Sequence, residues 1–234
     1  MGLVRMGAPT ELIMTLKSVF NLPLFVETGT YHGDTAAWAA NQFQSVITME
    51  YARTFFDRAV TRFQTTPNVR VIFGHSGVEM GNVIPTLNAP ALFWLDSHWS
   101  GGETYGEVDE CPLLEELDAI LKSPHRHFLL IDDARLFLSA PPEPHNPAVW
   151  PTLNDIMARL HPAYDVVVIE DNIIATPQHA RALIVEYCQH INTMAWEQYG
   201  DTIRRNRLQR GALSIQEGVQ MLGGALADKL RRWR

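Results

Sequence analysis

The sequence predicts an α/β fold built on an open, mostly parallel sheet, and three observations support this class. Short runs rich in β-branched and aromatic residues alternate with longer stretches of helical periodicity. Each short run stops at a polar or acidic residue, and the last two runs follow each other without a helix between them. Strands that alternate with helices favour right-handed βαβ units, which give a parallel sheet with helices on both faces.

Five strands and four helical stretches make up the alternating part of the chain. The predicted strands cover Leu24–Glu27, Ser45–Glu50, Val69–Phe73, Ala91–Asp96 and His127–Asp132. The amphipathic stretches between them cover Thr35–Gln42, Ala52–Gln64, Val78–Leu87 and Pro112–Leu121. Pro112 suits the start of its helix, because the first helical N–H has no partner within the helix and proline lacks that N–H.

The segment YDVVVIEDNIIATP, which ends at Pro177, predicts an antiparallel hairpin. Its two apolar β runs are separated by Asp171 and Asn172, residues typical of two-residue hairpin turns. Together with the five preceding strands, the hairpin gives a seven-stranded sheet with an antiparallel end. Residues 178–234 predict a helical extension, so we expect one domain over residues 1–234 with its core at 20–177.

Composition and charge exclude several classes of protein. No apolar run approaches the roughly 20 residues of a membrane helix, and the first residues lack the apolar stretch of a signal peptide. Two distant cysteines, Cys111 and Cys188, fit a reduced protein of the cytoplasm. The net charge of −7 argues against general nucleic-acid binding. The basic segments IRRNRLQR and KLRRWR are expected to form a solvated face or a subunit contact, with a polyanion site as the alternative.

Polar residues close every predicted strand. In chain order the strand ends carry Glu27, Glu50, Gly74-His75-Ser76, Asp96-Ser97-His98 and Asp132-Asp133. In an open α/β sheet, ligands bind beyond the carboxyl ends of the strands, where the strand order reverses. Five polar ends in register therefore predict one binding rim. Gly29 and Gly33 allow close backbone approach to a ligand, although a tight connection without a ligand would use them equally.

The segment VETGTYHGDT resembles motif I of the class I S-adenosylmethionine-dependent methyltransferases, an acidic residue followed by closely spaced glycines and small residues. Glu50, at the end of the next strand, matches that family's ribose-binding acid. Tyr31 stands where many members have a glycine. The resemblance implies a Rossmann-like fold. The cofactor-binding set that it implies is Glu27, Thr28, Gly29, Thr30, Tyr31, Gly33, Thr35, Glu50, His75, Ser76 and Asp96. A binding turn for another nucleotide, or for none, is the alternative.

The acidic ends of the fourth and fifth strands suggest a metal site. These strands are neighbours in the sheet order of the family, so Asp96, Asp132 and Asp133 should converge, and three carboxylates repel one another unless a cation or protons compensate. The set resembles metal-dependent O-methyltransferases of the macrocin and catechol types, which implies a divalent ion, Mg²⁺, that orients the acceptor and lowers its pKa. Asp133 is expected either to ligate the ion or to hydrogen-bond a ligand.

His98 and Asp96 are the predicted catalytic residues. A histidine side chain ordinarily titrates near pH ~6.5 and suits a general base, while a metal ligand or a plain loop residue are the alternatives for His98. The glycine-rich segment 98–110, which contains Trp99 and Tyr105, is expected to be a lid over the site or a plain connection.

Other polar residues have simpler interpretations. Arg135 is expected to form a salt bridge with one of the paired aspartates, or to bind an anionic substrate group. Glu115 and Glu116 are expected on a solvated helix face. The proline-rich segment Ser139–Pro151 predicts a surface loop long enough to take part in a site beside it.

These residues predict a Mg²⁺-dependent O-methyltransferase that acts on a hydroxyl of a sugar, a glycan or a small metabolite such as a phenol. A metal-dependent hydrolase on the same fold and a non-catalytic cofactor-binding or scaffold protein are the alternatives. No membrane partner is expected. The helical C-terminus is expected to build a homo-oligomer or to cap the substrate pocket.

Overall fold

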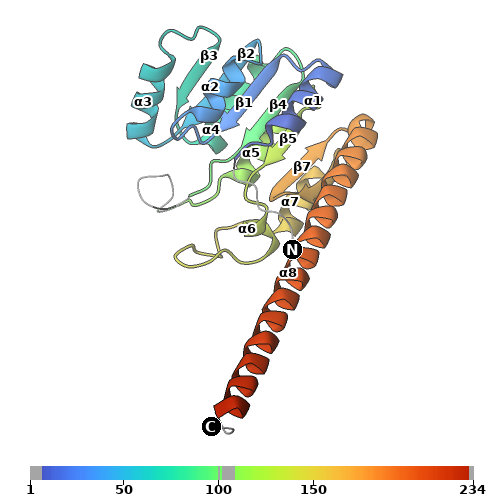
Figure 1. Ribbon diagram of the computed structural model, residues 1–234. Helices are drawn as coiled ribbons and strands as arrows, with labels where there is room; N and C mark the ends of the chain where they lie inside the picture. Colours follow the sequence, from blue (N-terminus) through green and yellow to red (C-terminus); the bar gives the residue numbers. More distant parts are fainter. Residues whose placement is uncertain (1–6, 100, 102–108, 232–234) are drawn as a thin grey trace. The chain divides into compact units, whose positions relative to one another are not determined.

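The computed structural model describes residues 7–99, 101 and 109–231, which form a seven-stranded sheet covered by helices (Figure 1). The chain divides into two compact units, Met1–Ile184 and Val185–Arg234. The first unit contains the whole sheet, and the second lies within the predicted helical extension.

The sheet has the predicted number of strands and the predicted directions. Its strands are β1 (Leu24–Thr28), β2 (Ser45–Glu50), β3 (Val69–Phe73), β4 (Ala91–Leu95), β5 (Phe128–Ile131), β6 (Asp165–Ile169) and β7 (Asn172–Thr176). They lie in the order β3-β2-β1-β4-β5-β7-β6. β1 to β5 are parallel, whereas β7 is antiparallel to both of its neighbours. This order confirms that β4 lies between β1 and β5.

The hairpin turn lies one residue earlier than predicted. Glu170 and Asp171 form it, and both have positive φ, 48° and 68°, which matches the right-handed twist of paired strands. Asn172, which we expected in the turn, is the first residue of β7. Its side-chain amide donates to the Glu170 carbonyl at 2.9 Å and so supports the turn from within the strand. The predicted position was therefore wrong by one residue.

Helices connect the strands and extend the chain at both ends. They are α1 (Thr10–Phe20), α2 (Asp34–Ala40), α3 (Arg53–Phe63), α4 (Ser76–Val83), η1 (Ile84–Thr86), α5 (Leu113–Ile120), α6 (Arg135–Leu138), α7 (Leu153–Leu160), η2 (Gln178–Ala180) and α8 (Arg181–Arg231). Helices α1, α6 and α7 were not predicted from the sequence. Pro112 precedes α5 as its cap residue instead of occupying the first helical position.

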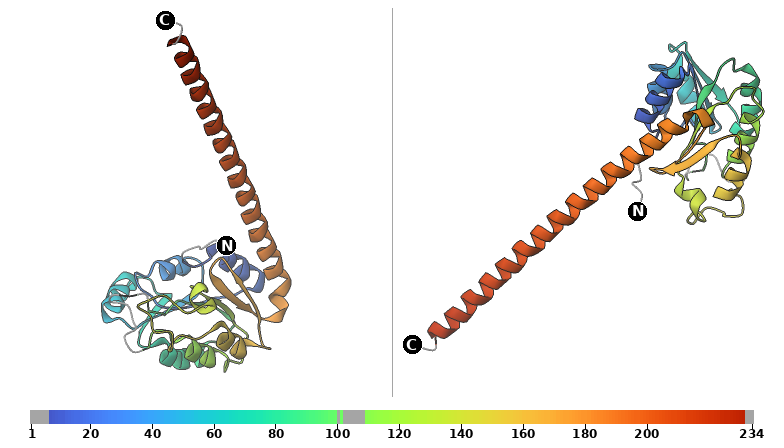
Figure 2. Two further views of the ribbon diagram at one scale, coloured as in Figure 1. Left: turned by 90° about the horizontal axis from the view of Figure 1, so that it is seen from below. Right: turned by 90° about the vertical axis from the view of Figure 1, so that its right-hand side faces the viewer.

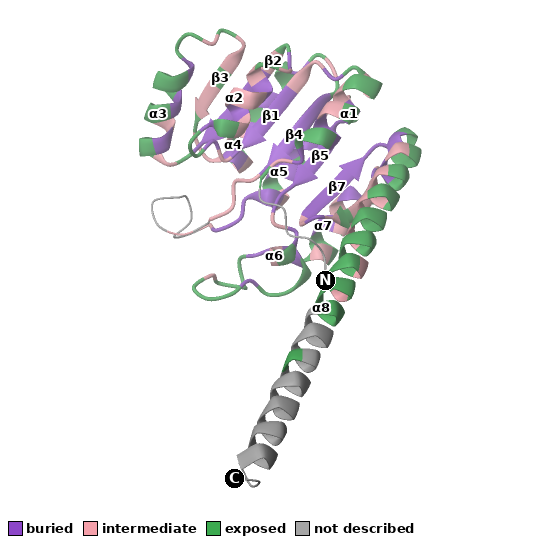
Figure 3. Ribbon diagram, viewed as in Figure 1, coloured by how far each residue is buried: buried purple, intermediate pink, exposed green. Residues whose placement is uncertain are grey.

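The helices form layers on both faces of the sheet. Helix α5 packs against α4 and α7 on one face, where Met80 and Leu117 belong to the main hydrophobic core (Figure 2). On the other face Phe20 of α1 packs on Phe128 of β5, with 4.9 Å between ring centroids. Strands β1, β4, β5 and β7 are buried along nearly their whole length, whereas the edge strands β3 and β6 are partly exposed (Figure 3).

Helix α8 is continuous over 51 residues. Gly200 and Gly211 do not interrupt it, and a Cβ built at Gly200 would meet no atom within 4 Å. Among the described residues, no helix combines the length and the apolar character needed to cross a bilayer.

Candidate functional site

A cavity of about 340 Å³ opens at the carboxyl ends of β1 to β4, where the strand order reverses between β1 and β4. Small-molecule sites commonly have volumes of about 300–1,000 Å³. Residues that the sequence analysis assigned to the site line it: Gly29, Tyr31, Glu50, His75, Ser76, Asp96 and His98. The rest of the lining comes from the predicted rim (Gly74 and Ser97), from the segment expected to be a lid (Gly101), and from residues without an earlier assignment to the site (Met49, Tyr51 and Phe55).

Position 29 requires glycine because β1 and β4 approach each other closely at this edge. Gly29 has a φ of 82°, and a Cβ built there would lie 2.2 Å from the carbonyl oxygen of Asp96. The Gly29 N–H donates to the Met49 carbonyl at 3.0 Å. The turn after β1 is therefore tied to both β2 and β4.

Glu50 holds the turn that follows Gly29. Its Oε2 accepts from the Tyr31 N–H at 2.8 Å, and its Oε1 accepts from the Ala52 N–H at 2.8 Å. Tyr31 has a φ of 48°, unusual for a side chain of this size, and its ring packs on Phe55 with 4.7 Å between centroids. Each carboxylate oxygen keeps a lone pair for a further donor, so Glu50 can support the turn and bind a ligand together.

The remaining predicted cofactor residues do not line the cavity. They are Glu27, Thr28, Thr30, Gly33 and Thr35. The Thr48 hydroxyl donates to Glu27 Oε2 at 2.6 Å and lies 2.5 Å from the Thr30 hydroxyl oxygen. Burial raises the pKa of Glu27 to about 8, against hydrogen bonds from Thr48 and Thr35 that lower it. Glu27 is thus mainly protonated at neutral pH and supports the strand ends from inside.

Asp96 and Asp132 follow paired residues of neighbouring strands, since Leu95 lies opposite Ile131. Desolvation raises the pKa of Asp96 well above its usual range, and the negative charges of Asp132, Asp133 and Glu27 raise it further. A third of the Asp96 side chain is nevertheless exposed, so water at the cavity screens part of this effect. Burial and the charge of Asp133 raise the pKa of Asp132 to about 6.

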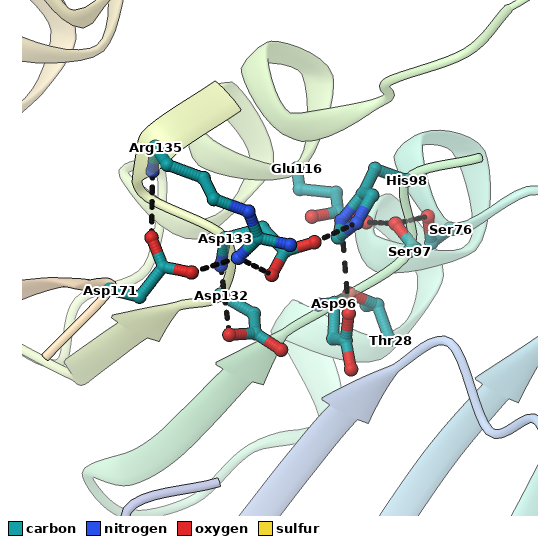
Figure 4. A network of polar contacts seen from close by, with 10 residues as sticks. All are labelled: Thr28, Ser76, Asp96, Ser97, His98, Glu116, Asp132, Asp133, Arg135 and Asp171. Atoms are coloured by element: carbon teal, nitrogen blue, oxygen red, sulfur yellow. Dashed lines mark hydrogen bonds and ion pairs between the residues drawn. The ribbon is translucent and has the colours of Figure 1, made fainter. Parts of the chain in front are cut away.

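Asp133 has the opposite electrostatic environment (Figure 4). His98 Nε2 lies 2.8 Å from its Oδ2, and Arg135 donates to its Oδ1 at 2.6 Å. Burial alone would raise the pKa of Asp133, but the hydrogen bonds and charges of His98 and Arg135 lower it. Arg135 also forms an ion pair with Asp171. The expected salt bridge between Arg135 and one of the paired aspartates is confirmed.

Two of the three predicted metal ligands suit a divalent cation in this arrangement. Asp96 and Asp132 are adjacent carboxylates whose ionisation is disfavoured, and Mg²⁺ commonly binds through one or two carboxylates together with water. Both oxygens of Asp133 are already bonded to His98 and Arg135. In the described ranges, no three or more His, Cys, Asp or Glu side chains form a group that could hold a metal ion.

His98 is oriented by its neighbours. Its side chain is 6% exposed, and its ring lies 5.7 Å from the ring of Trp150. When Nε2 carries the proton that faces the carboxylate of Asp133, Nδ1 is the acceptor nitrogen. Nδ1 lies 3.7 Å from Asp96 Oδ1, and both residues line the cavity. His98 can therefore take a proton from a group bound there.

The expectation of a solvated face at Glu116 was wrong. Glu116 is 1% exposed, and its Oε1 accepts a hydrogen bond from the Ser97 hydroxyl at 2.6 Å. The signal was present in the sequence, because position 116 lies three residues after Leu113 and four before Ile120, so the three share one helix face. Glu115 is exposed as expected.

Glu110 anchors the proline-rich loop beside the site. Trp150 Nε1 donates to its Oε2 at 2.5 Å, and the Asn146 N–H donates to its Oε1 at 3.0 Å. Its carbonyl accepts from the Trp99 N–H at 2.8 Å. Most of the predicted lid, residues 100 and 102–108 with Tyr105, lies outside the described residues.

Comparisons with known proteins support the fold through solved structures. No family model matches this chain, and no curated protein matches it in sequence. An O-methyltransferase from Bacillus cereus in complex with S-adenosylhomocysteine has a TM-score of 0.51 at 17% identity, over 74% of this chain and 82% of that chain.

Two other solved structures are similar to the same extent. The O-methyltransferase TomG from Streptomyces achromogenes, in complex with S-adenosylmethionine, has a TM-score of 0.50 at 16% identity, over 74% of this chain and 82% of that chain. The Podospora anserina methyltransferase PaMTH1 has a TM-score of 0.50 at 16% identity, over 74% of this chain and 80% of that chain. The predicted class I methyltransferase fold is therefore confirmed.

Proposed function

We propose that this chain is an S-adenosylmethionine-dependent O-methyltransferase and that the cavity at the ends of β1 to β4 binds the methyl donor. The observation that carries the proposal is the placement of Gly29, Glu50, Asp96 and His98 around one cavity at the reversal of strand order. In open α/β sheets this is where ligands bind. The shared fold supports the proposal.

The cavity offers complementary groups for the parts of the donor. Glu50 would accept hydrogen bonds from ribose hydroxyls with the lone pairs that its two backbone partners leave free. The backbone at Gly29 would approach the methionine part. His75 and Ser76 would face the adenine. When bound, S-adenosylmethionine supplies an electrophilic methyl group on a sulfonium.

His98 would act on the acceptor. Its Nδ1 would take the hydroxyl proton, and Asp133 would stabilise the positive charge that the ring then carries. Arg135 holds Asp133 in place for this task. The rest of the protein's contribution is alignment, because displacement at a sulfonium methyl requires the acceptor oxygen in line with the breaking bond.

We also infer that a divalent ion, Mg²⁺, binds at Asp96 and Asp132, with Asp133 holding His98 instead of the ion. The raised pKa values of the two carboxylates support this, since a cation would relieve their repulsion. Such an ion would supply Lewis-acid activation of the acceptor hydroxyl. Binding of Mg²⁺ should raise the melting temperature of the wild-type protein. The variant with Asp96→Asn and Asp132→Asn should show no such rise.

The proposed acceptor is a hydroxyl of a sugar or glycan, with a small phenol as the other candidate. Hydrogen-bonding side chains such as Ser97, Asp96 and His98 on the cavity wall support a polyol. The activity would take place in the cytoplasm, where the free cysteines Cys111 and Cys188 would persist.

Methyl transfer from a labelled donor to panels of sugars, glycans and phenols tests the proposal. We expect label in at least one hydroxyl compound, and a loss of about a hundredfold or more in His98→Ala, because removing a general base typically has that effect. The variant with Glu50→Ala should need more donor for half-maximal rate. Donor binding without transfer to any acceptor would favour a scaffold protein, and hydrolysis of a substrate without donor binding would favour a hydrolase.

We propose in addition that α8 brings two copies of the chain together. Its described part exposes large apolar side chains: Trp196 is 72%, Tyr199 59% and Leu208 74% exposed. A single helix gains little stability in water without a partner surface. A second copy would cover these side chains.

A further inference from the structure

We propose that Glu116 is a positioning residue for the cofactor cavity, which it shapes through the hydroxyl groups of Ser97 and Ser76. This inference rests on the proposed function. Glu116 lies on α5 and does not line the cavity, whereas both serines do. Its role would be to fix where the end of β4 and the start of α4 stand relative to each other.

The contacts form a short chain from the helix to the cavity wall (Figure 4). The Ser97 hydroxyl donates to Glu116 Oε1 at 2.6 Å, and the hydroxyl oxygens of Ser76 and Ser97 lie 3.0 Å apart. Either hydroxyl can donate in the contact between the serines, and Ser76 also hydrogen-bonds Glu116 itself. A third hydroxyl, that of Thr28 at the end of β1, also hydrogen-bonds Glu116. One carboxyl thus connects three segments that meet at the cavity.

Each of these segments carries a part of the proposed site. Ser97 lies between Asp96 and His98, so its position sets theirs. Ser76 is the first residue of α4 and follows His75 directly. Thr28 Oγ1 also accepts from the Asp96 N–H at 3.3 Å, which adds a second connection between β1 and β4.

The interior explains why a carboxyl group can occupy this position. Burial raises the pKa of Glu116, while the hydroxyls of Ser76, Ser97 and Thr28 act in the opposite direction. The three hydroxyl partners offset part of the free energy that burying this carboxyl group requires. An apolar side chain would fill the helix face equally well, but it would leave the serine hydroxyls without their acceptor.

Helix packing keeps the carboxyl in place. A Cβ built at Gly77 of α4 would lie 2.8 Å from the Cβ of Glu115, so α4 and α5 are in close contact beside Glu116. Little room is left for α5 to shift and restore lost hydrogen bonds after a substitution. A substitution at Glu116 should therefore change the positions of Ser97 and Ser76, because α5 cannot shift to compensate for it.

Binding of S-adenosylhomocysteine to the full chain, measured by calorimetry well below the melting temperature, tests the inference. Glu116→Ala should weaken binding about tenfold or more, because loss of the acceptor releases both serines. Glu116→Gln, which keeps an oxygen at the same place, should bind within about threefold of the wild type. Glu115→Gln is the matched control on the exposed face and should bind as the wild type does.

A double-mutant cycle separates positioning from a general loss of stability. Ser97→Ala should weaken binding, and Glu116→Ala combined with Ser97→Ala should bind no more weakly than Glu116→Ala alone, because both act through one chain of hydrogen bonds. If Glu116→Ala does not fold, the affinities of Ser97→Ala and Glu116→Gln for S-adenosylhomocysteine still test the inference. Unchanged binding in Ser97→Ala would overturn the inference, as would a lower melting temperature of Glu116→Ala with wild-type affinity.

The same experiment distinguishes this inference from the proposed function. Binding by the wild type together with unaltered binding by the variants would remove the role of Glu116 and leave the methyl-donor site in place. No binding by the wild type would contradict both the proposed function and the role of Glu116.

Discussion

At the scale of single residues, the surroundings of each acid decide its charge. Burial raises the pKa of Glu27 to about 8 and that of Asp132 to about 6, whereas His98 and Arg135 lower the pKa of Asp133. At neutral pH the rim therefore combines a neutral acid below the cavity with an ionised aspartate beside the candidate base. This division of charge suits the proposed site, which would bind a cationic donor and accept a proton.

Gly29→Ala should be strongly destabilising. The new Cβ would meet the Asp96 carbonyl, and the residue would be held at a positive φ, so we expect a loss of about 3 kcal/mol or more of unfolding free energy. Gly81→Ala is the control, because a Cβ at Gly81 in α4 would meet no atom within 4 Å. It should be neutral or stabilising by up to about 1 kcal/mol. Equal stability of the two variants in urea unfolding would contradict the close approach of β1 and β4.

His127 should make stability depend on pH. Its Nδ1 accepts from the Ala91 N–H at 3.0 Å, and burial lowers its pKa to about 4. The ordinary pKa of histidine is about 6.5, so the unfolded chain binds the proton first as the pH falls. The stabilisation of the folded chain by neutral His127 is complete above pH ~6.5 and is lost towards pH ~4. The free energy of unfolding should therefore fall by about 2 kcal/mol between pH ~7 and pH ~5.

Urea unfolding of the wild type and His127→Gln over this pH range measures the effect. The variant should lack this part of the pH dependence, while His190→Gln, a change at an exposed histidine of α8, should retain it. A parallel pH dependence in the wild type and His127→Gln would refute the neutral, buried state of this side chain.

Single residues also show where sequence reasoning ends. Glu50 and Asp96 were found because strand ends in an open sheet meet at one edge, and that rule needs no distant contact. Glu116 was misplaced because an acidic residue on a helix is usually solvated, although its spacing from Leu113 and Ile120 indicated the buried face. The anchoring of the proline-rich loop by Glu110 has no local signal, since its partners lie 35 to 40 residues away.

At the scale of elements, strands were predicted more reliably than helices. β1, β4 and β5 are buried on both faces and so appear as continuous apolar runs, which sequence patterns identify well. Helix α1 carries buried Leu12, Ile13 and Leu16, a helical spacing in a segment for which no helix was predicted. The hairpin was predicted correctly, but its turn was predicted one residue too late, because the side chain of Asn172 supports the turn from within β7.

The loop at 139–151 should depend on one indole hydrogen bond. Trp150→Phe removes the donor to Glu110 and leaves a buried carboxylate with one partner fewer, which typically costs about 1–3 kcal/mol. We expect a lower melting temperature and faster proteolytic cleavage within this loop. Trp196→Phe, at a side chain that is 72% exposed, is the matched control and should change neither. Identical cleavage of the loop in Trp150→Phe and the wild type would show that Glu110 does not anchor it.

At the scale of the whole molecule, the compact unit Met1–Ile184 holds the complete sheet and the cavity, and the described part of the unit Val185–Arg234 is helical. We therefore expect the full chain to have the mass of two copies in light scattering coupled to size exclusion. A chain that ends at Ile184 should have the mass of one copy. A full chain with the mass of one copy at every concentration would contradict self-association through α8.

The central claim is that the cavity at the ends of β1 to β4 binds the methyl donor, and a crystal structure grown with S-adenosylhomocysteine and Mg²⁺ tests it most directly. The account predicts electron density for the nucleoside in this cavity, with both ribose hydroxyls hydrogen-bonded to Glu50 and the thioether sulfur near Gly29 and Asp96. Nucleoside density at any other place on the protein, with this cavity filled only by water, would contradict the account.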